Sequence, residues 1–285
     1  MHLVILGATG GTGLQIVQKA IEKGHSSQTE DKVSPVLLYN YAGVLSELGR
    51  FREAADYAGR ASEKAKRVGD QMLIDQTDFQ LERIFRDQHS FARADALLAG
   101  LELRLRLKLP PAHYAFALLT SERALLAQAA EDQSAALELS NRAVDEDEES
   151  IKVTGQCATI LPVLLTRRSS AELEAGLEKR AVADASRALG LLQAAMEPGT
   201  YSSYLGRAYM ALAQALKLQG IDDEARKAFR SAAEHLEISL GRSNPDARRA
   251  RELAESEQVG RGPIEGMTSN LDPTVAKQRS SRSGR

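Results

Sequence analysis

The stretch YAGVLSELGRFREAADYAGRA, residues 41–61, carries the pattern that decides the fold. Gly49 divides it into two segments, Phe51 opens the second, and small residues recur along both, namely Ala42, Ala54, Ala58 and Ala61. Helices that pack as antiparallel pairs need small residues where their backbones approach and larger residues in the grooves between them. The stretch therefore predicts two antiparallel helices joined by a turn at Gly49.

The same arrangement recurs along the chain from Pro35 to about Ala254. The clearest further copy is AYMALAQALKLQGIDDEARKAFRSAAEHL, residues 208–236, which turns at Gly220. Weaker copies cover residues 121–144 and 169–189. A fifth copy, residues 81–101, departs from the pattern because Glu82 occupies the small position of its first helix.

This spacing resembles the tetratricopeptide repeat (TPR) signature. The resemblance covers residues 35–256 and implies an all-α solenoid of about five antiparallel helical hairpins. In such arrays the first helix of each repeat lines a concave groove that holds an extended peptide or a partner helix. The implied function is a non-catalytic protein–protein interaction scaffold or adaptor. The implied groove residues are Tyr39, Glu47, Arg83, Arg86, Asp87, Gln128, Arg207, Met210, Gln214 and Lys217.

Residues 1–25 differ from everything that follows. The apolar run Leu3–Leu6 predicts a strand, GATGGTG follows as a glycine-rich turn, and a helix then ends at Gly24. This Rossmann-like fragment resembles the NAD(P)-binding loop of atypical short-chain dehydrogenases/reductases. The resemblance implies that Gly7, Gly10 and Gly13 let the backbone approach the pyrophosphate of NADP or NAD.

An NAD(P)-binding, reductase-like protein is therefore the alternative function. Residues 26–34 read as a polar linker, however, where a dinucleotide site needs a second strand. We thus expect no cofactor. The fragment at residues 1–25 is either functional, a remnant of a gene fusion or a misassembled start.

Composition narrows the function classes. The 37 basic and 39 acidic side chains are interleaved and give a net charge of −2, so we expect no nucleic-acid partner. Cys157 is the single cysteine and the five histidines are scattered, so we expect no metal site. We found no catalytic motif and no apolar stretch that would span a membrane, which predicts a cytoplasmic protein that is not an enzyme.

Three segments of the sequence need a separate structural interpretation. LELRLRLKL, residues 101–109, alternates like a strand, but its leucines also share a helical face, and we favour a helix ended by Pro110. DEDEES, residues 145–150, could hold a divalent cation, but we favour a solvated linker or the start of the next helix. Residues 257–285 are rich in Gly, Ser and Arg and predict a disordered tail.

Overall fold

The computed structural model describes residues 33–47, 49–155 and 160–259. Within these residues all regular structure is helical. The elements are α2 (Pro35–Glu47), α3 (Phe51–Val68), α4 (Gln71–Asp87), α5 (Phe91–Arg106), α6 (Tyr114–Ala129), α7 (Gln133–Thr154), α8 (Leu161–Glu174), α9 (Glu178–Ala195), α10 (Ser203–Leu218), α11 (Asp222–Leu240) and α12 (Pro245–Val259). The all-α prediction is confirmed for this part of the chain.

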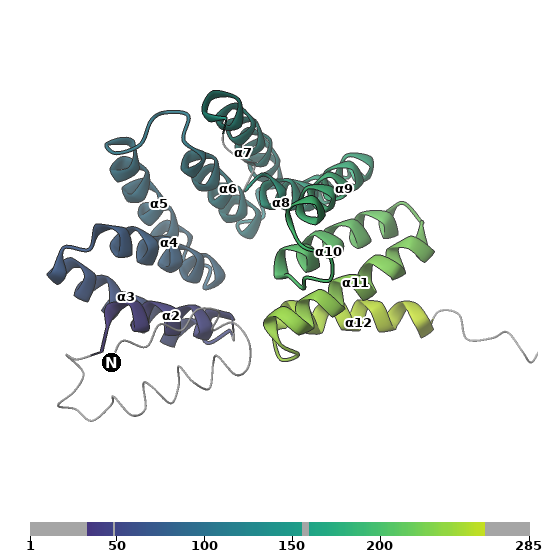
Figure 1. Ribbon diagram of the computed structural model, residues 1–285, viewed down its shortest axis with the longest axis horizontal. Coiled ribbons are helices and arrows are strands. Elements are labelled where there is room, and N and C mark those ends of the chain that lie inside the picture. The colour runs from purple at the N-terminus through teal and green to yellow at the C-terminus, as the bar shows by residue number, and fades with distance from the viewer. Residues whose placement is uncertain (1–32, 48, 156–159, 260–285) are drawn as a thin grey trace, which may run out of the picture.

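The helices pair into consecutive antiparallel hairpins, and the hairpins stack along an arc (Figure 1). The pairs are α2–α3, α4–α5, α6–α7, α8–α9 and α10–α11, which correspond to the copies predicted from the sequence. Helix α12 follows the last pair and packs on α11 through Ala247, Ala250 and Ala254. The arc brings α12 back toward α2, so the two ends of the described array approach each other (Figure 1).

The turn inside each hairpin has a left-handed residue at its centre. Gly49, Gly176 and Gly220 have φ values of 73°, 71° and 75° at this position. His89 and Glu131 occupy it in the second and third hairpins with φ values of 56° and 62°. Glycine adopts this conformation without steric cost, whereas other residues do not, so these two turns depart from the glycine pattern of the other three.

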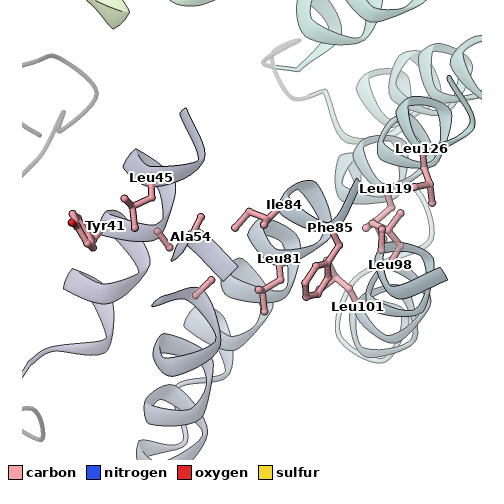
Figure 2. Packing of buried hydrophobic residues seen from close by; sticks show 13 residues of the cluster. Tyr41, Leu45, Ala54, Leu81, Ile84, Phe85, Leu98, Leu101, Leu119 and Leu126 are labelled. Carbon is pink, nitrogen blue, oxygen red and sulfur yellow. The ribbon is translucent and has the colours of Figure 1, made fainter. Parts of the chain in front are cut away.

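Small residues allow the two helices of each hairpin to approach closely. Ala42 packs beside Ala54 and Ala58, and all three are fully buried. Leucines, Ile84 and Phe85 fill the space between hairpins, so one core runs from α2 to α6 (Figure 2). The register predicted for the first copy is therefore the observed one.

Two ambiguous segments are helical. Residues 101–106 continue α5, with Leu98 and Leu101 buried, so the helix alternative is confirmed. The helix ends at Arg106, however, which is before the predicted stop at Pro110. Residues 107–109 form a turn between the two positions.

The interpretation of residues 145–150 as a linker or a helix start was wrong, since they lie inside α7. Glu146 accepts a hydrogen bond from Thr120, Glu148 pairs with Arg187, and Asp147 is buried. The acidic run is thus used for helix packing. Among the described residues, no group of three His, Cys, Asp or Glu side chains is arranged to hold a metal ion.

Several predictions fall on residues outside the described ranges. These are the fragment at residues 1–25 with Gly7, Gly10 and Gly13, most of the linker, Cys157, and the tail from residue 260. Helix α12 ends at Val259, whereas the predicted repeat region ends at residue 256. The division of the chain into domains stays a prediction. None of the helices in the described ranges is both long enough and apolar enough to cross a bilayer.

Candidate functional site

The first helices of the hairpins form one continuous side of the array. Helix α2 contacts α4, α4 contacts α6, α6 contacts α8, and α8 contacts α10, although a second helix separates each pair in sequence. The five helices follow the inner side of the arc (Figure 1). We call this side the inner face, and it carries the predicted groove residues.

An ion network fixes α4, α6 and α8 relative to one another on this face. Glu122 of α6 receives one hydrogen bond from Arg86 of α4, at 2.7 Å, and another from Arg167 of α8, at 2.9 Å. Arg167 also donates to the Ser121 hydroxyl at 2.9 Å. The Glu122 side chain is fully buried, so both of its oxygens depend on these arginines.

A second carboxyl group lies at the edge of this network. Glu82 is fully buried, and Arg86 approaches its Oε1 at 3.4 Å. Its Oε2 has no hydrogen-bond partner among the described residues. Burial, and then the charge of Glu122, raises the pKa of Glu82 to about 8. Glu82 is therefore mostly protonated at neutral pH, which lets a glutamate occupy the position that holds alanine or serine in the other hairpins.

The pKa of Glu122 is shifted in the opposite direction to that of Glu82. Burial acts to raise its pKa, but Arg167 and Arg86 outweigh burial and hold the pKa below its ordinary value. It stays ionised at neutral pH and carries the charge that the two arginines neutralise. One shared arginine, Arg86, therefore serves an ionised carboxylate on α6 and a protonated carboxyl on its own helix.

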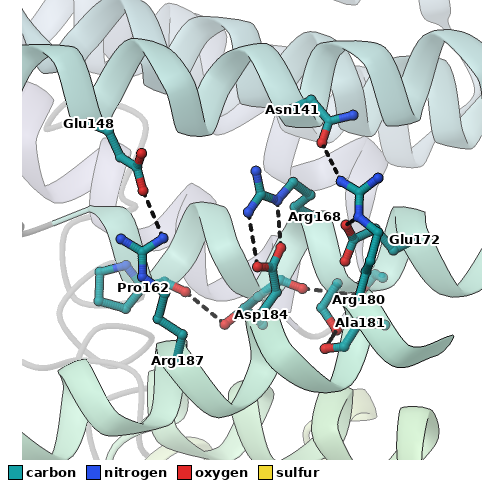
Figure 3. Close-up of polar contacts among 12 residues, drawn as sticks. Asn141, Glu148, Pro162, Arg168, Glu172, Arg180, Ala181, Asp184 and Arg187 are labelled. Atoms are coloured by element: carbon teal, nitrogen blue, oxygen red, sulfur yellow. Dashed lines mark hydrogen bonds and ion pairs between the residues drawn. The ribbon is translucent and has the colours of Figure 1, made fainter. Parts of the chain in front are cut away.

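Further ion pairs join α7, α8 and α9 (Figure 3). Arg168 donates two hydrogen bonds to Asp184, at 2.5 and 2.9 Å, within the α8–α9 hairpin. Arg180 pairs with the buried Glu172 at 2.9 Å. Arg187 reaches Glu148 of α7 at 2.7 Å. These charged side chains are thus used for contacts within and between the hairpins.

The predicted groove residues divide into those held by other helices and those that lie nearer the surface. Arg86 lies in the ion network, Gln128 donates to Glu174 at 2.5 Å, and Arg207 pairs with Asp246 at 2.9 Å. Tyr39, Met210 and Gln214 are half-buried, and Lys217 is exposed at the end of α10. Glu47 is the last residue of α2, and its side chain lies outside the described part.

Arg83 and Asp87 are the exposed charges of α4. Arg83 makes no direct hydrogen bond or ion pair with another described residue, although its charge lies near Tyr39, Glu82 and Asp87. Burial raises the pKa of Asp87 even though Arg86 and Arg83 act to lower it. Asp87 also pairs with Arg86 at 3.6 Å, so Arg83 is the more accessible of the two charges to a ligand.

A cavity of about 230 Å³ joins the two ends of the array. From the first end it is lined by Phe51, Arg83 and Asp87, and from the last end by Arg207, Pro245 and Asp246. The structure thus brings three predicted groove residues, Arg83, Asp87 and Arg207, to one place. It does not bring the other seven there.

The sequence analysis missed Glu122, Arg167 and Asp246. Glu122 and Arg167 are separated by 45 residues, and only the stacking of α6 against α8 brings them together. The available signal was a charged residue within an apolar helix, as at Glu122 in FALLTSERALLA. Nothing in the local pattern around Asp246 indicates that the two ends approach.

No protein-family model matches the chain, and no curated protein matches it in sequence. Solved structures match the fold. A thermophilic TPR protein from Thermus thermophilus has a TM-score of 0.54 at 18% identity, over 79% of this chain and 100% of that one.

Two larger proteins contain a similar region. The signal transduction ATPase with a tetratricopeptide repeat sensor from Pyrococcus horikoshii has a TM-score of 0.57 at 14% identity, over 88% of this chain and 35% of that one. A Rap protein complexed with competence and sporulation factor has a TM-score of 0.55 at 14% identity, over 87% and 70%. The described residues therefore have the fold of a TPR-like helical repeat array.

Proposed function

We propose that this protein is a non-catalytic scaffold that binds a partner peptide or a partner helix along the inner face. The observation that carries the proposal is the cavity between the two ends, where Arg83 and Asp87 face Arg207 and Asp246. A segment lying along the inner face would contact α4 and α10 at the same time. Solenoid arrays commonly use their concave side in this way.

The ion network supports the proposal because it prepares the face before a partner arrives. Arg86, Glu122 and Arg167 hold α4, α6 and α8 in a fixed register. A preformed surface loses less conformational freedom on binding than one that must be ordered. The partner would therefore meet a rigid wall at α4–α8 with the exposed charges of Arg83 and Asp87 at its edge.

Among the solved neighbours, the Rap structure is a complex with competence and sporulation factor. For this chain the partner is proposed only as a protein or peptide. We propose no nucleic-acid partner, no membrane association and no cofactor, and we place the protein in the cytoplasm.

The test begins with affinity capture by the full chain, followed by photo-crosslinking of the captured partner. A photoreactive amino acid at Asp87, on the inner face, is compared with one at Lys227, an exposed position on α11. We expect crosslinks at position 87 and few at 227. As a second comparison, Arg83→Glu should weaken capture and Lys227→Glu should not. Crosslinking at position 227 alone, with capture unaffected by Arg83→Glu, would refute the inner-face assignment.

The alternative, in which Gly7, Gly10 and Gly13 hold NADP or NAD, concerns residues outside the described ranges, and the comparisons lend it no support. Titration of the full chain with NADH and NADPH separates the two functions. A few loop amides contribute about 0.5–1.5 kcal/mol each, which corresponds to affinities of about 1 mM or weaker. Micromolar binding that Gly10→Val abolishes would favour the reductase-like function instead.

A further inference from the structure

A second pocket lies beside the loop between α9 and α10. It has a volume of about 440 Å³ and lies against the end of α9, the start of α10 and the last turns of α11. Its lining includes Gln193, Glu197, Tyr201, Tyr209, Glu234 and His235. None of the ten predicted groove residues lines it, so this α9–α10 pocket is separate from the inner-face site.

Three aromatic rings form one wall of the pocket. The ring of His235 lies 5.4 Å from that of Tyr201 and 5.6 Å from that of Tyr209, with the Tyr209 ring nearly parallel at 18°. Gln193 donates a hydrogen bond to the Tyr209 hydroxyl at 2.9 Å and holds this ring in place. The pocket lining therefore includes two tyrosine rings that lie in contact with His235.

The histidine of this wall does not contribute a positive charge. Burial lowers the pKa of His235, although Glu234 acts in the opposite direction. The Ser202 N–H points to His235 Nδ1 at 3.4 Å, so Nδ1 acts as an acceptor and the ring proton lies on Nε2. The imidazole is thus a neutral ring at neutral pH.

Every charged group of the pocket lining is negative. Glu197 and Glu234 supply carboxylates, and Tyr201 donates a hydrogen bond to Glu234 Oε1 at 2.9 Å. The lining contains neither lysine nor arginine. Helix α9 ends here at Ala195, and the C-cap residue, Met196, is extended. A helix C-terminus carries partial negative charge on its last carbonyl groups, which adds to the two carboxylates.

From this arrangement we propose that the α9–α10 pocket binds an organic cation of the alkylammonium or guanidinium class. Such a group is attracted to tyrosine faces and forms charge-assisted hydrogen bonds with carboxylates. Ligand pockets in proteins commonly have volumes of about 300–1,000 Å³, which includes this one. The cation can come from a lysine or arginine side chain of a partner protein or from a small free amine.

The experiment titrates the full chain with N-acetyl-arginine methylamide and with tetramethylammonium by calorimetry, and follows the His235 ring protons by NMR. The citrulline derivative of the same length is the neutral control. We expect saturable binding of the cations, shifts at His235 and no binding of citrulline. Glu234→Gln and Tyr201→Leu should each weaken binding by about tenfold, since each removes one attraction of the pocket.

Tyr204→Leu is the matched control variant. Tyr204 is exposed and lies in the same segment as Tyr201, but it does not line the pocket, so binding should be unchanged. A peptide with one arginine between glycines distinguishes the sources: tighter binding than the single residue indicates a protein partner, and equal or weaker binding indicates a small amine. Glu197→Gln provides a second test of the carboxylates if Glu234→Gln lowers the circular dichroism signal.

Three results would overturn the proposal. These are a lack of saturation by either cation, equal binding of the citrulline control, and affinities unchanged by both the carboxylate and the Tyr201→Leu substitutions. Loss of partner crosslinking at the inner face would not affect it, because the two sites share no lining residue.

Discussion

The outer hairpins, α2–α3 and α10–α11, differ from the three middle hairpins, α4–α9, in what their interiors contain. The outer pairs bury mainly alanines and larger apolar residues, and neither buries a carboxyl group among its described side chains. The middle hairpins bury six carboxyl-bearing side chains, namely Asp78, Glu82, Glu122, Asp147, Glu172 and Asp184. Apolar packing thus stabilises every hairpin, and the middle hairpins bury charged groups in addition.

This difference teaches which substitutions each region tolerates. An apolar contact is sensitive to volume, because a packed interior has no room for additional atoms. A buried ion pair is sensitive to loss of either partner, because the remaining charge is left without compensation. The outer hairpins should therefore be sensitive mainly to changes of size, and the middle hairpins to changes of charge as well.

The largest effect is expected at Glu122. Glu122→Leu removes the carboxylate that neutralises Arg86 and Arg167 and leaves both arginines in a largely buried place. We expect the free energy of unfolding to fall by about 3–5 kcal/mol. Urea denaturation followed by circular dichroism measures it. A change below about 1 kcal/mol, the value of an exposed ion pair, would mean that the network is solvated and does not hold the helices together.

A volume change should have the next largest effect, in an outer hairpin. A Cβ at Gly206 of α10 would lie 2.6 Å from Cγ of Leu236, a fully buried side chain of α11. Gly206→Ala should therefore cost about 1–3 kcal/mol through overpacking.

Gly59→Ala in α3 is the matched control for Gly206→Ala. Apart from its chain neighbours and the backbone of its own helix, no atom lies within 4 Å of a Cβ added there, and Gly59 is inside a helix. Alanine should raise stability at this position by about 0.5–1 kcal/mol because it loses less conformational entropy in the helix. Equal effects of the two substitutions in thermal unfolding would show that the α10–α11 contact is not tight.

The turns of the middle hairpins offer a smaller, stabilising change. Glu131 is exposed and has a left-handed φ of 62°, where Gly220 of the last hairpin has 75°. Glu131→Gly should raise the free energy of unfolding by about 1 kcal/mol, because the Cβ penalty of this conformation disappears. Gly220→Ala should lose a similar amount. A destabilising Glu131→Gly in urea denaturation would contradict the steric account of the weaker turns.

The remaining prediction is a pH dependence from Glu82. Its pKa is raised from 4.5 to about 8 in the fold, so between these values the unfolded chain has released a proton that the folded chain still holds. Stability contributed by this group is therefore lost as the pH rises from about 4.5 to about 8. Glu82→Gln keeps the shape and removes the titration, so its stability should fall less over this range. Parallel stability curves for the two proteins would show that Glu82 is ionised in the fold.

The sequence predicts the outer hairpins better than the middle ones, for a physical reason. Small residues at Ala42, Ala54, Ala213 and Ala225 form a local pattern, because each contact joins the two helices of one hairpin. The copy at residues 81–101 departs from the pattern at Glu82, which the structure explains by protonation and by the approach of Arg86. A raised pKa of this kind depends on the neighbouring hairpin and has no signature in the local sequence.

Prediction of the candidate sites from the local sequence is limited in the same way. Arg83 and Asp87 were predicted from their helical position, but their approach to Arg207 depends on the curvature of the whole array. The α9–α10 pocket was not predicted, because Tyr201, Tyr209 and His235 come from a loop and two helices. The acidic run at residues 145–150 was misinterpreted because its charges, read without their partners on α6 and α9, are typical of a solvated segment.

The most direct test of the account is to delete residues 1–32 and measure helicity and partner capture together. We predict that the shortened chain keeps the helical circular dichroism signal of the full chain, unfolds cooperatively and captures the same partner, because each repeat contacts mainly its neighbours. Collapse of the helical signal, or a folded array that no longer captures the partner, would contradict the claim that the repeat array is itself the folded and binding unit.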